Sequence, residues 1–270
     1  MGLNMALTKF LFSKRAAYGY GGRVLTLGKQ EIAVTTAEIK ALGGAVTQVS
    51  HQTATDGEYL KALGFATIDS MDVSAHDGAT ILHNLNEPVS AALWDLFDCV
   101  IDGGTLEHCF NVSACMESVL RMLKSGGSVI HINPTAGSSN HGFYNFQPTF
   151  YFSFYGANGF GSMDCHFIEM HTDPRSIFTD KDARVRVVPV ENWNNLDYHT
   201  AHPSYVIFRA VKGSREPEPP VVPIQEFYYR IFREKQKVGG GRIDDAIYRR
   251  IRGDVGENDY QRIMGKSYWL

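Results

Sequence analysis

The strongest constraint on the fold is a series of short apolar segments that alternate with helix-like segments through the first half of the chain. These apolar segments are typical of buried strands, and most of them end at glycine, aspartate or asparagine. They are Val24 to Leu27, Phe65 to Val73, Ala79 to Leu82, Phe97 to Ile101 and Ser128 to Ile132. The alternation predicts βαβ units and a mostly parallel, doubly wound α/β sheet with helices on both faces.

Helix signals lie between the predicted strands. Thr35 and Glu38 have the spacing of a capping box, which predicts that a helix begins there. A second helix is predicted over Asp56 to Leu63. Asn111 is predicted to cap a third helix that ends at Gly126.

Two later strands are predicted over Phe167 to Met170 and Tyr205 to Val211, and we expect them to form an antiparallel pair at the edge of the sheet. After them comes a proline-rich stretch, Glu216 to Pro223, which excludes a regular helix or an inner strand. We therefore predict one core domain over residues 1–215 and an extension over residues 216–270.

The extension is predicted to be a helical C-terminal tail. Ile224 to Lys237 has a helical pattern of apolar residues, and Ile243 to Ile251 resumes it after three glycines. Three roles for this tail stay open: covering a pocket, contacting a second subunit of a homo-oligomer, or packing on the core.

Composition narrows the expected partners. The 270 residues carry a net charge of -3, so no overall positive field attracts nucleic acid, and we do not expect a nucleic-acid partner. The four cysteines form no CxxC pair, which predicts neither disulfides nor a metal site. Lys9 interrupts the apolar start of the chain, and no uncharged run is long enough to span a membrane. We therefore expect a cytoplasmic protein.

Ligands of an open parallel sheet bind outside the carboxyl ends of its strands. The residues at those positions are the candidate binding residues, namely Gly28, Gln30, Asp72, Asn84, Asp102, Gly103 and Thr105. Glycine at 28 allows a close approach of the backbone to a ligand. The carboxylate of Asp72 is suited to a ribose diol, and the amide of Asn84 to the edge of an adenine.

Each of these residues also has a structural interpretation. Gly28 fits an ordinary strand-to-helix turn. Asp72 can cap the turn that follows it, and Asn84 and Asn86 can be turn formers. Glu107 and His108 can lie in a solvated turn. Both interpretations stay open at each position.

Two stretches of sequence resemble a known family. Phe97 to Asp102 followed by Thr105 to His108, and then Leu123 to Gly127, are similar to segments of S-adenosylmethionine-dependent methyltransferases with a Rossmann-like fold. The resemblance covers roughly Arg23 to Lys212. It implies a seven-stranded sheet with an antiparallel edge pair, and S-adenosylmethionine as the cofactor of the candidate binding residues. The glycine motif of the family is reduced here to Gly28-Lys29-Gln30, where the Gln30 amide is expected to replace backbone donors.

The segment from His141 to Pro148 lies where this family forms its acceptor site. His108 and His141 are therefore candidates for a catalytic base, and Tyr144 is a candidate for positioning the acceptor. The resemblance implies methyl transfer to a small-molecule or glycan-type acceptor. The aromatic run Phe150 to Tyr155 is interpreted as core or lid packing, because no basic residues are interleaved with it.

Two other functions remain as alternatives. The fold could serve as a catalytically inactive, methyltransferase-like binding or scaffold protein, since the first motif has lost glycines. A nicotinamide-dependent oxidoreductase is less well supported, because the Gly28-Lys29-Gln30 turn lacks the GxGxxG pattern that binds a pyrophosphate.

Overall fold

The computed structural model describes residues 2–190, 199–214, 218–237 and 266–270. Within these residues, nine strands form the main sheet. They are β2 (Arg23–Leu27), β4 (Thr67–Asp72), β5 (Ile81–Leu82), β6 (Phe97–Asp102), β7 (Leu123–Ala136), β8 (Phe160–His171), β9 (Arg184–Pro189), β10 (Ser204–Lys212) and β11 (Tyr268–Trp269). Two further strands, β1 (Gly2–Leu3) and β3 (Glu31–Ile32), form a small parallel pair.

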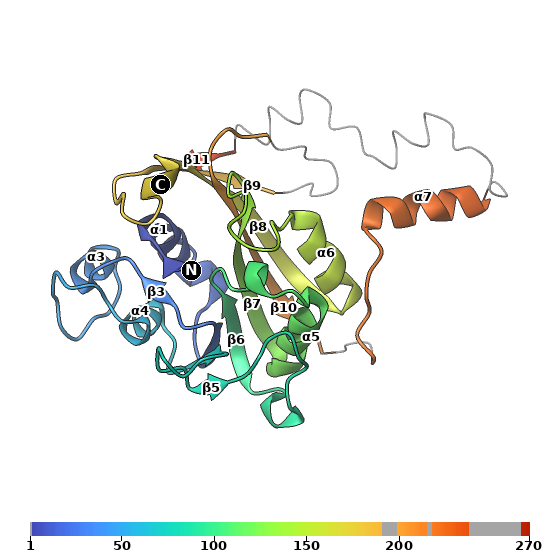
Figure 1. Cartoon of the computed structure of the whole chain (residues 1–270), viewed down its shortest axis with the longest axis horizontal. Coiled ribbons are helices and arrows are strands. Elements are labelled where there is room, and N and C mark those ends of the chain that lie inside the picture. The colour runs from blue at the N-terminus through green and yellow to red at the C-terminus, as the bar shows by residue number, and fades with distance from the viewer. Residues whose placement is uncertain (1, 191–198, 215–217, 238–265) are drawn as a thin grey trace.

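The helices are distributed along the chain between these strands (Figure 1). The α-helices are α1 (Met5–Ser13), α2 (Arg15–Tyr18), α3 (Thr36–Ala41), α4 (Asp56–Leu63), α5 (Val112–Met122), α6 (Pro148–Ala157) and α7 (Glu226–Lys237). Three short 3-10 helices are η1 (Ala91–Leu93), η2 (Leu106–His108) and η3 (Pro174–Ser176).

The strand order is β11-β9-β8-β10-β7-β6-β2-β4-β5. The five strands from β7 to β5 are parallel to one another, while β10 is antiparallel to both β7 and β8. After β2 the chain forms β4 and then β5 on one side of this strand. It then crosses back, so that β6 and β7 lie on the other side of β2. The predicted α/β fold with a mostly parallel central sheet is confirmed, and a topological switch point lies between β2 and β6.

The prediction of seven strands with an antiparallel pair at the edge is wrong in two respects. The sheet has nine strands among the described residues. The two late strands, β8 and β10, do pair antiparallel, but β10 lies inside the sheet between β7 and β8. The strand β9, which pairs with β8, and the two-residue β11 lie beyond this pair. The connection before β10 contains the alternating segment Arg184-Val185-Arg186-Val187, whose two valines are fully buried, and this period of two forms the additional strand.

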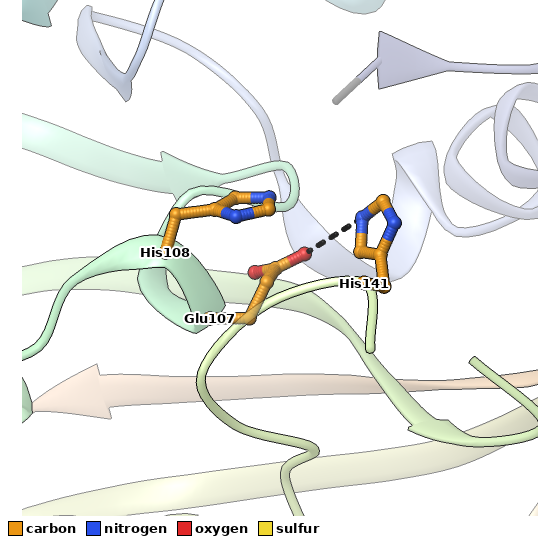
Figure 2. A group of neighbouring side chains, drawn as sticks. All are labelled: Glu107, His108 and His141. Carbon is orange, nitrogen blue, oxygen red and sulfur yellow. Dashed lines mark ion pairs between the residues drawn. The ribbon is translucent and has the colours of Figure 1, made fainter. Parts of the chain in front are cut away.

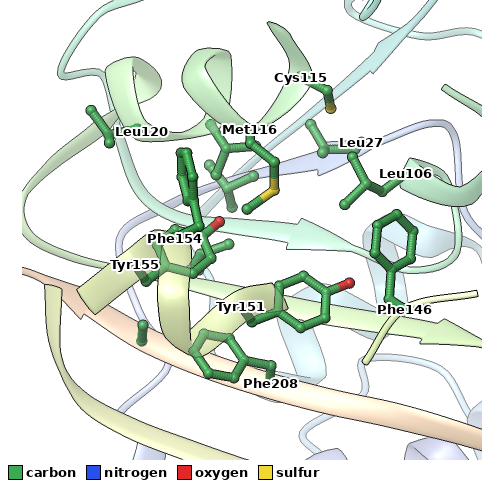
Figure 3. Close-up of a cluster of buried hydrophobic side chains, with 14 of the residues drawn as sticks. Leu27, Leu106, Cys115, Met116, Leu120, Phe146, Tyr151, Phe154, Tyr155 and Phe208 are labelled. Carbon is green, nitrogen blue, oxygen red and sulfur yellow. The ribbon is translucent and has the colours of Figure 1, made fainter. Parts of the chain in front are cut away.

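The two faces of the sheet bury separate apolar clusters. On β2, Leu25 and Leu27 pack into a cluster with α5 and α6, while Val24 packs on the opposite face with α1 and α4. Figure 3 shows the first cluster, in which Met116 of α5 and Tyr151 of α6 meet over the strands. The alternation of side chains along each strand therefore produces a three-layer α/β/α arrangement.

The helix caps follow the sequence signals closely. Thr35 and Glu38 form a reciprocal capping box at the start of α3, and the side chain of Asn111 accepts a hydrogen bond from Ala114 N at the start of α5. The end of α5 differs from the prediction, because this helix ends at Met122 and Gly126 lies within β7. That strand also continues to Ala136, since β10 pairs with it along most of its length.

Besides the four-residue α2, two helices have no counterpart in the sequence-based predictions. The first, α1, lies at the start of the chain and buries Leu7, Phe10 and Leu11 against the sheet. The second, α6, begins at Pro148, which is well placed in a first helical turn. Within the described residues, no helix has the length and apolar character needed to cross a membrane. The second helix predicted in the tail, Ile243 to Ile251, lies outside the described residues.

Candidate functional site

The carboxyl ends of β2, β4 and β6 meet at the switch point. The amide of Gly28 donates to the carbonyl of Met71 at 2.7 Å, and the amide of Lys29 donates to a carboxylate oxygen of Asp72 at 3.1 Å. Gly28 has a φ of +71°, and a β-carbon there would lie 2.6 Å from Oγ1 of Thr105. Only glycine fits this turn without strain, so the three strand ends can approach one another closely.

Two side chains fill the crevice between β2 and β6. The Thr105 hydroxyl donates to the carbonyl of Leu27 at 2.6 Å. The side-chain amide of Gln30 donates to the same carbonyl at 2.8 Å and to that of Gly28 at 3.3 Å. A β-carbon at Gly103 would lie only 2.1 Å from Oε1 of Gln30. Gln30 therefore does bring an amide donor to this turn, and its donors are directed to the carbonyls at the end of the strand.

The neighbouring Lys29 does not enter the crevice. Its Nζ forms an ion pair with Oδ2 of Asp56 at 2.8 Å, on the first turn of α4. The Lys29 amine therefore extends toward α4 and away from the crevice. The side chains that fill the crevice are those of Gln30 and Thr105.

The carboxylate of Asp72 is half-buried at the end of β4. One oxygen accepts the hydrogen bond from Lys29 N, and the other accepts from Ser74 N at 3.2 Å. The second bond is the turn-capping role considered for this residue. Each carboxylate oxygen has two lone pairs, so both oxygens retain acceptor capacity for a ligand.

Asn84 lies one strand further out, after β5, and is exposed. Its side-chain oxygen accepts from the backbone amide of Asn86 at 3.1 Å, and Glu87 N donates to its carbonyl at 2.9 Å. These bonds make Asn84 part of a turn. The structure thus brings Gly28, Gln30, Asp72, Gly103 and Thr105 together, and it places Asn84 at the periphery of this group.

Asp102 differs from the other candidates because its side chain points into the core. It has no exposed surface, and one oxygen accepts the amides of Thr105 and Leu106 at 2.9 and 3.1 Å. The other oxygen is bonded to Nδ1 of His131 and to Nδ2 of Asn133, both at 2.9 Å. Burial alone would raise the pKa of Asp102, but these bonds, above all that to His131, hold the pKa below its usual value. Asp102 therefore orders the loop that follows β6.

A buried polar network extends from Asp102 toward α6. His131 Nε2 is bonded to the hydroxyl of Tyr155 at 2.6 Å, and the hydroxyl of Tyr151 donates to the side-chain oxygen of Asn133. Both tyrosines are fully buried, which agrees with their interpretation as packing residues. Neither His131 nor Asn133 is among the polar residues predicted for the site. The available signal was a single histidine between Ile130 and Ile132, where an apolar strand would otherwise continue.

Glu107, His108 and His141 form a compact group at the same edge of the sheet (Figure 2). Glu107 is fully buried, and its Oε2 accepts from Nδ2 of Asn133 at 2.9 Å. Its Oε1 lies 4.0 Å from Nε2 of His141 and has no hydrogen-bond donor among the described residues. Burial, together with the negative charge of Asp102, raises the pKa of Glu107 to about 7.

The loop that carries His141 is fixed against the 105–110 segment. The amide of Phe143 donates to the carbonyl of Glu107 at 2.8 Å, and the hydroxyl of Tyr144 donates to the carbonyl of Phe110 at 3.0 Å. The rings of Phe110 and Phe143 pack edge to face with their centroids 5.4 Å apart. His108 and His141, predicted from separate stretches of sequence, are thereby brought together with ring centroids 5.2 Å apart.

Tyr144 lies on a groove of about 570 Å³ beside this group. The groove is lined by Phe110, Asn111, Val112, Ser113, Tyr144, Asn145, Phe146, Gln147, Thr149 and Phe150. Its mixture of aromatic rings and amide side chains suits a ligand with both apolar faces and hydroxyl groups.

No family model and no curated protein matches this sequence. Among solved structures, a putative methyltransferase from Bacillus halodurans is 8% identical over 76% of this chain and 99% of its own, with a TM-score of 0.42. A SAM-dependent methyltransferase from Archaeoglobus fulgidus is 13% identical over 77% of this chain and 95% of its own, with a TM-score of 0.44. TehB from Haemophilus influenzae is 13% identical over 74% of this chain and 61% of its own, with a TM-score of 0.43. At identities this low, the chemistry of the site has to be inferred from the residues of this chain and not from its structural neighbours.

Proposed function

We propose that this protein transfers a methyl group from S-adenosylmethionine to a small-molecule or glycan-type acceptor. The observation that carries the proposal is the convergence of Gly28, Asp72 and Gly103 at the switch point of the sheet. In open α/β sheets this crevice is where a nucleoside-bearing ligand binds. The half-buried carboxylate of Asp72 is placed to accept hydrogen bonds from a ribose diol.

The residues present fit one half of the cofactor directly. Asp72 retains lone pairs on both oxygens, which suits the ribose. The amino-acid half requires a rearrangement, because the Gln30 amide occupies the space over Gly103. When Gln30 turns away, the carbonyls of Leu27 and Gly28 lose a donor and can accept hydrogen bonds from the ammonium group of the cofactor.

The acceptor side is assigned to His108, His141 and Tyr144. When bound, S-adenosylmethionine supplies an electrophilic methyl group, so the protein has to orient the acceptor, exclude water and accept a proton where the acceptor carries one. His141 lies beside the buried carboxylate of Glu107, which would stabilise the ring after it takes up that proton. Tyr144 lines the groove in which we place the acceptor.

A binding protein without methyl transfer remains the alternative to this proposal. Gln30 and Thr105 fill the crevice, so a cofactor would first have to displace the Gln30 side chain. A protein of this kind would bind its ligand in the groove beside Tyr144 and would not need Asp72. The two functions therefore differ in whether the cofactor binds at all.

Calorimetric titration of the full chain with S-adenosylmethionine and with its demethylated product tests the proposal. We expect both to bind, and we expect Asp72→Ala to weaken binding about tenfold or more, since a charge-assisted contact contributes about 1.5 to 3 kcal/mol. Asp77→Ala is the matched control, because Asp77 is exposed and lies five residues further along the chain. If neither compound binds to the folded protein, methyl transfer is rejected and the binding-protein alternative is left.

Three further expectations stay predictions. These are the division of the chain at residue 215, the cytoplasmic location, and the role of the tail, whether it covers a pocket, contacts a second subunit or packs on the core. All four cysteines are buried free thiols, namely Cys99, Cys109, Cys115 and Cys165.

A further inference from the structure

Glu107, His108 and His141 offer three atoms of the kind that bind metal ions. One carboxylate oxygen and one nitrogen of each ring lie within 4.8 Å of one another. Figure 2 shows that the three side chains come from two segments, η2 and the loop after β7, and point toward a common space. A carboxylate with two imidazoles is a ligand set that zinc and other divalent transition metals use.

The buried carboxylate provides a second observation. Glu107 has no exposed surface, yet its Oε1 has no donor in the part of the chain that the structure describes. The neighbouring Asp102 has both oxygens bonded, whereas Glu107 receives only the bond from Asn133 on Oε2. An anionic oxygen that is buried without a partner is costly, and a cation in front of it would remove that cost.

The segment that carries His141 is already held in place for such a site. Its neighbour Phe143 is hydrogen-bonded to the carbonyl of Glu107, and a β-carbon at Gly142 would lie 2.7 Å from that same oxygen. The backbones of residues 107 and 142 therefore touch, and only glycine allows this approach. Both imidazole rings are exposed, so small rotations can shorten the present 4.0 Å between His141 Nε2 and Glu107 Oε1.

We propose that Glu107, His108 and His141 bind one divalent first-row transition-metal ion, with Zn²⁺ as the first ion to test. Ligand atoms of such an ion lie about 2.0 to 2.2 Å from it, so each side chain has to move by roughly 1 Å or less. Three protein ligands leave at least one position open, as in catalytic rather than structural zinc sites.

An ion at this place would also bear on the reaction. This consequence, unlike the binding itself, rests on the proposed function. His108 and His141 would then act as ligands, and the positive charge would favour transfer of the proton of a hydroxyl acceptor to solvent water, without His141 as the base.

The chain contains a matched control for the ligand set. Glu169, His171 and His202 also offer a carboxylate and two imidazoles within 4.8 Å. In this second group the Glu169 carboxylate is bonded to Nε2 of His171, so its Oε1 has a partner, unlike Oε1 of Glu107. Substitutions in the two groups remove the same residue types from two places in one protein.

The test is a calorimetric titration of the full chain with Zn²⁺, after treatment with a chelator and without any cofactor. We expect the wild-type protein to bind Zn²⁺ with micromolar or better affinity. The double variant His108→Gln/His141→Gln should bind it about a hundredfold more weakly or not at all. The double variant His171→Gln/His202→Gln should retain the wild-type affinity of this site. Circular dichroism and thermal unfolding check that both variants are folded.

Three results would overturn the proposal: no binding of Zn²⁺ to the wild-type protein, unchanged binding by His108→Gln/His141→Gln, or loss only in His171→Gln/His202→Gln. Because both histidines of the proposed site are exposed, their replacement does not disturb the core, and Glu107→Gln provides a third variant of unchanged shape. The Zn²⁺ titration contains no S-adenosylmethionine, so a failure to bind Zn²⁺ would not count against methyl transfer. In the same way, a failure to bind S-adenosylmethionine would not count against the metal site.

Discussion

The side-chain oxygen of Gln30 lies so close to the backbone of Gly103 that a β-carbon at residue 103 would come within 2.1 Å of it. The same side chain is buried and donates to the carbonyl of Leu27 at 2.8 Å. The contact joins the loop after β2 to the end of β6 across the switch point. A ligand that passes between these strands therefore has to displace the Gln30 side chain.

Gln30→Ala should bind the demethylated cofactor more tightly than the wild-type protein. Displacing Gln30 breaks its hydrogen bonds to the carbonyls of Leu27 and Gly28, of which the shorter contributes about 1 kcal/mol net, and the alanine variant avoids that cost. The expected gain in affinity is roughly fivefold, measured by calorimetric titration. Gln52→Ala, at an exposed glutamine, should leave the affinity unchanged. Weaker binding by Gln30→Ala would show instead that Gln30 contacts the ligand.

Asp102→Asn should destabilise the fold strongly. The substitution removes the negative charge from a buried group that is bonded to His131, Asn133 and two backbone amides. Breaking such a buried network by changing one partner costs about 3 kcal/mol or more. Urea unfolding measures the loss, with exposed Asp77→Asn expected to change stability by less than about 0.5 kcal/mol. Equal stability of the two variants would show that the network contributes little.

His166 should make the protein less stable as the pH falls. Its ring is buried, and burial lowers its pKa to about 4, whereas an unfolded histidine has a pKa near 6.5. Between these values the unfolded chain takes up a proton that the folded protein does not, so stability present at neutral pH is lost toward about pH 4. The loss from this residue is up to about 3 kcal/mol.

The measurement is urea unfolding from about pH 7 down to about pH 4.5. His166→Gln should show a shallower dependence on pH than the wild-type protein, whatever its absolute stability. His51→Gln, at an exposed histidine, should keep the wild-type slope. An unchanged slope in His166→Gln would mean that the folded ring takes up its proton at the same pH as in the unfolded chain.

Gly142→Ala should displace the loop that carries His141. The new β-carbon would lie 2.7 Å from the carbonyl oxygen of Glu107, and neither backbone can move away without cost. We expect a loss of about 1 to 3 kcal/mol in thermal or urea unfolding. Gly57→Ala, where the nearest atom is 3.9 Å from the new carbon, should be neutral or slightly stabilising. A neutral Gly142→Ala would contradict the close contact of the two segments.

Local signals in the sequence predicted most of the elements around the site. The capping boxes of α3 and α4 depend on residues three positions apart, such as Thr55 and Glu58, so short-range chemistry defines where these helices begin. The central strands follow from short apolar runs, and the residues at their ends follow from the strand-end rule. This is why Gly28, Asp72 and Thr105 could be singled out together.

Features that depend on pairing between distant segments could not be predicted in this way. β11, which has only two residues, is a strand because it pairs with β9, and the place of β10 between β7 and β8 also depends on pairing. His131 reads as an interruption of an apolar strand until Asp102 on β6 and Tyr155 on α6 are beside it. Propensity carries no information on such partners, because they are 24 or more residues away.

The sequence alone determined the class of sheet, the positions where β2, β4 and β6 end, and the polar residues available there, because these depend on periodicity and on capping over a few residues. Only the tertiary structure decided that Gln30 fills the crevice, that Asp102 faces the core, and that Glu107 is buried beside His141. These outcomes depend on which loops meet at the edge of the folded sheet, and on which buried polar atoms then find a partner.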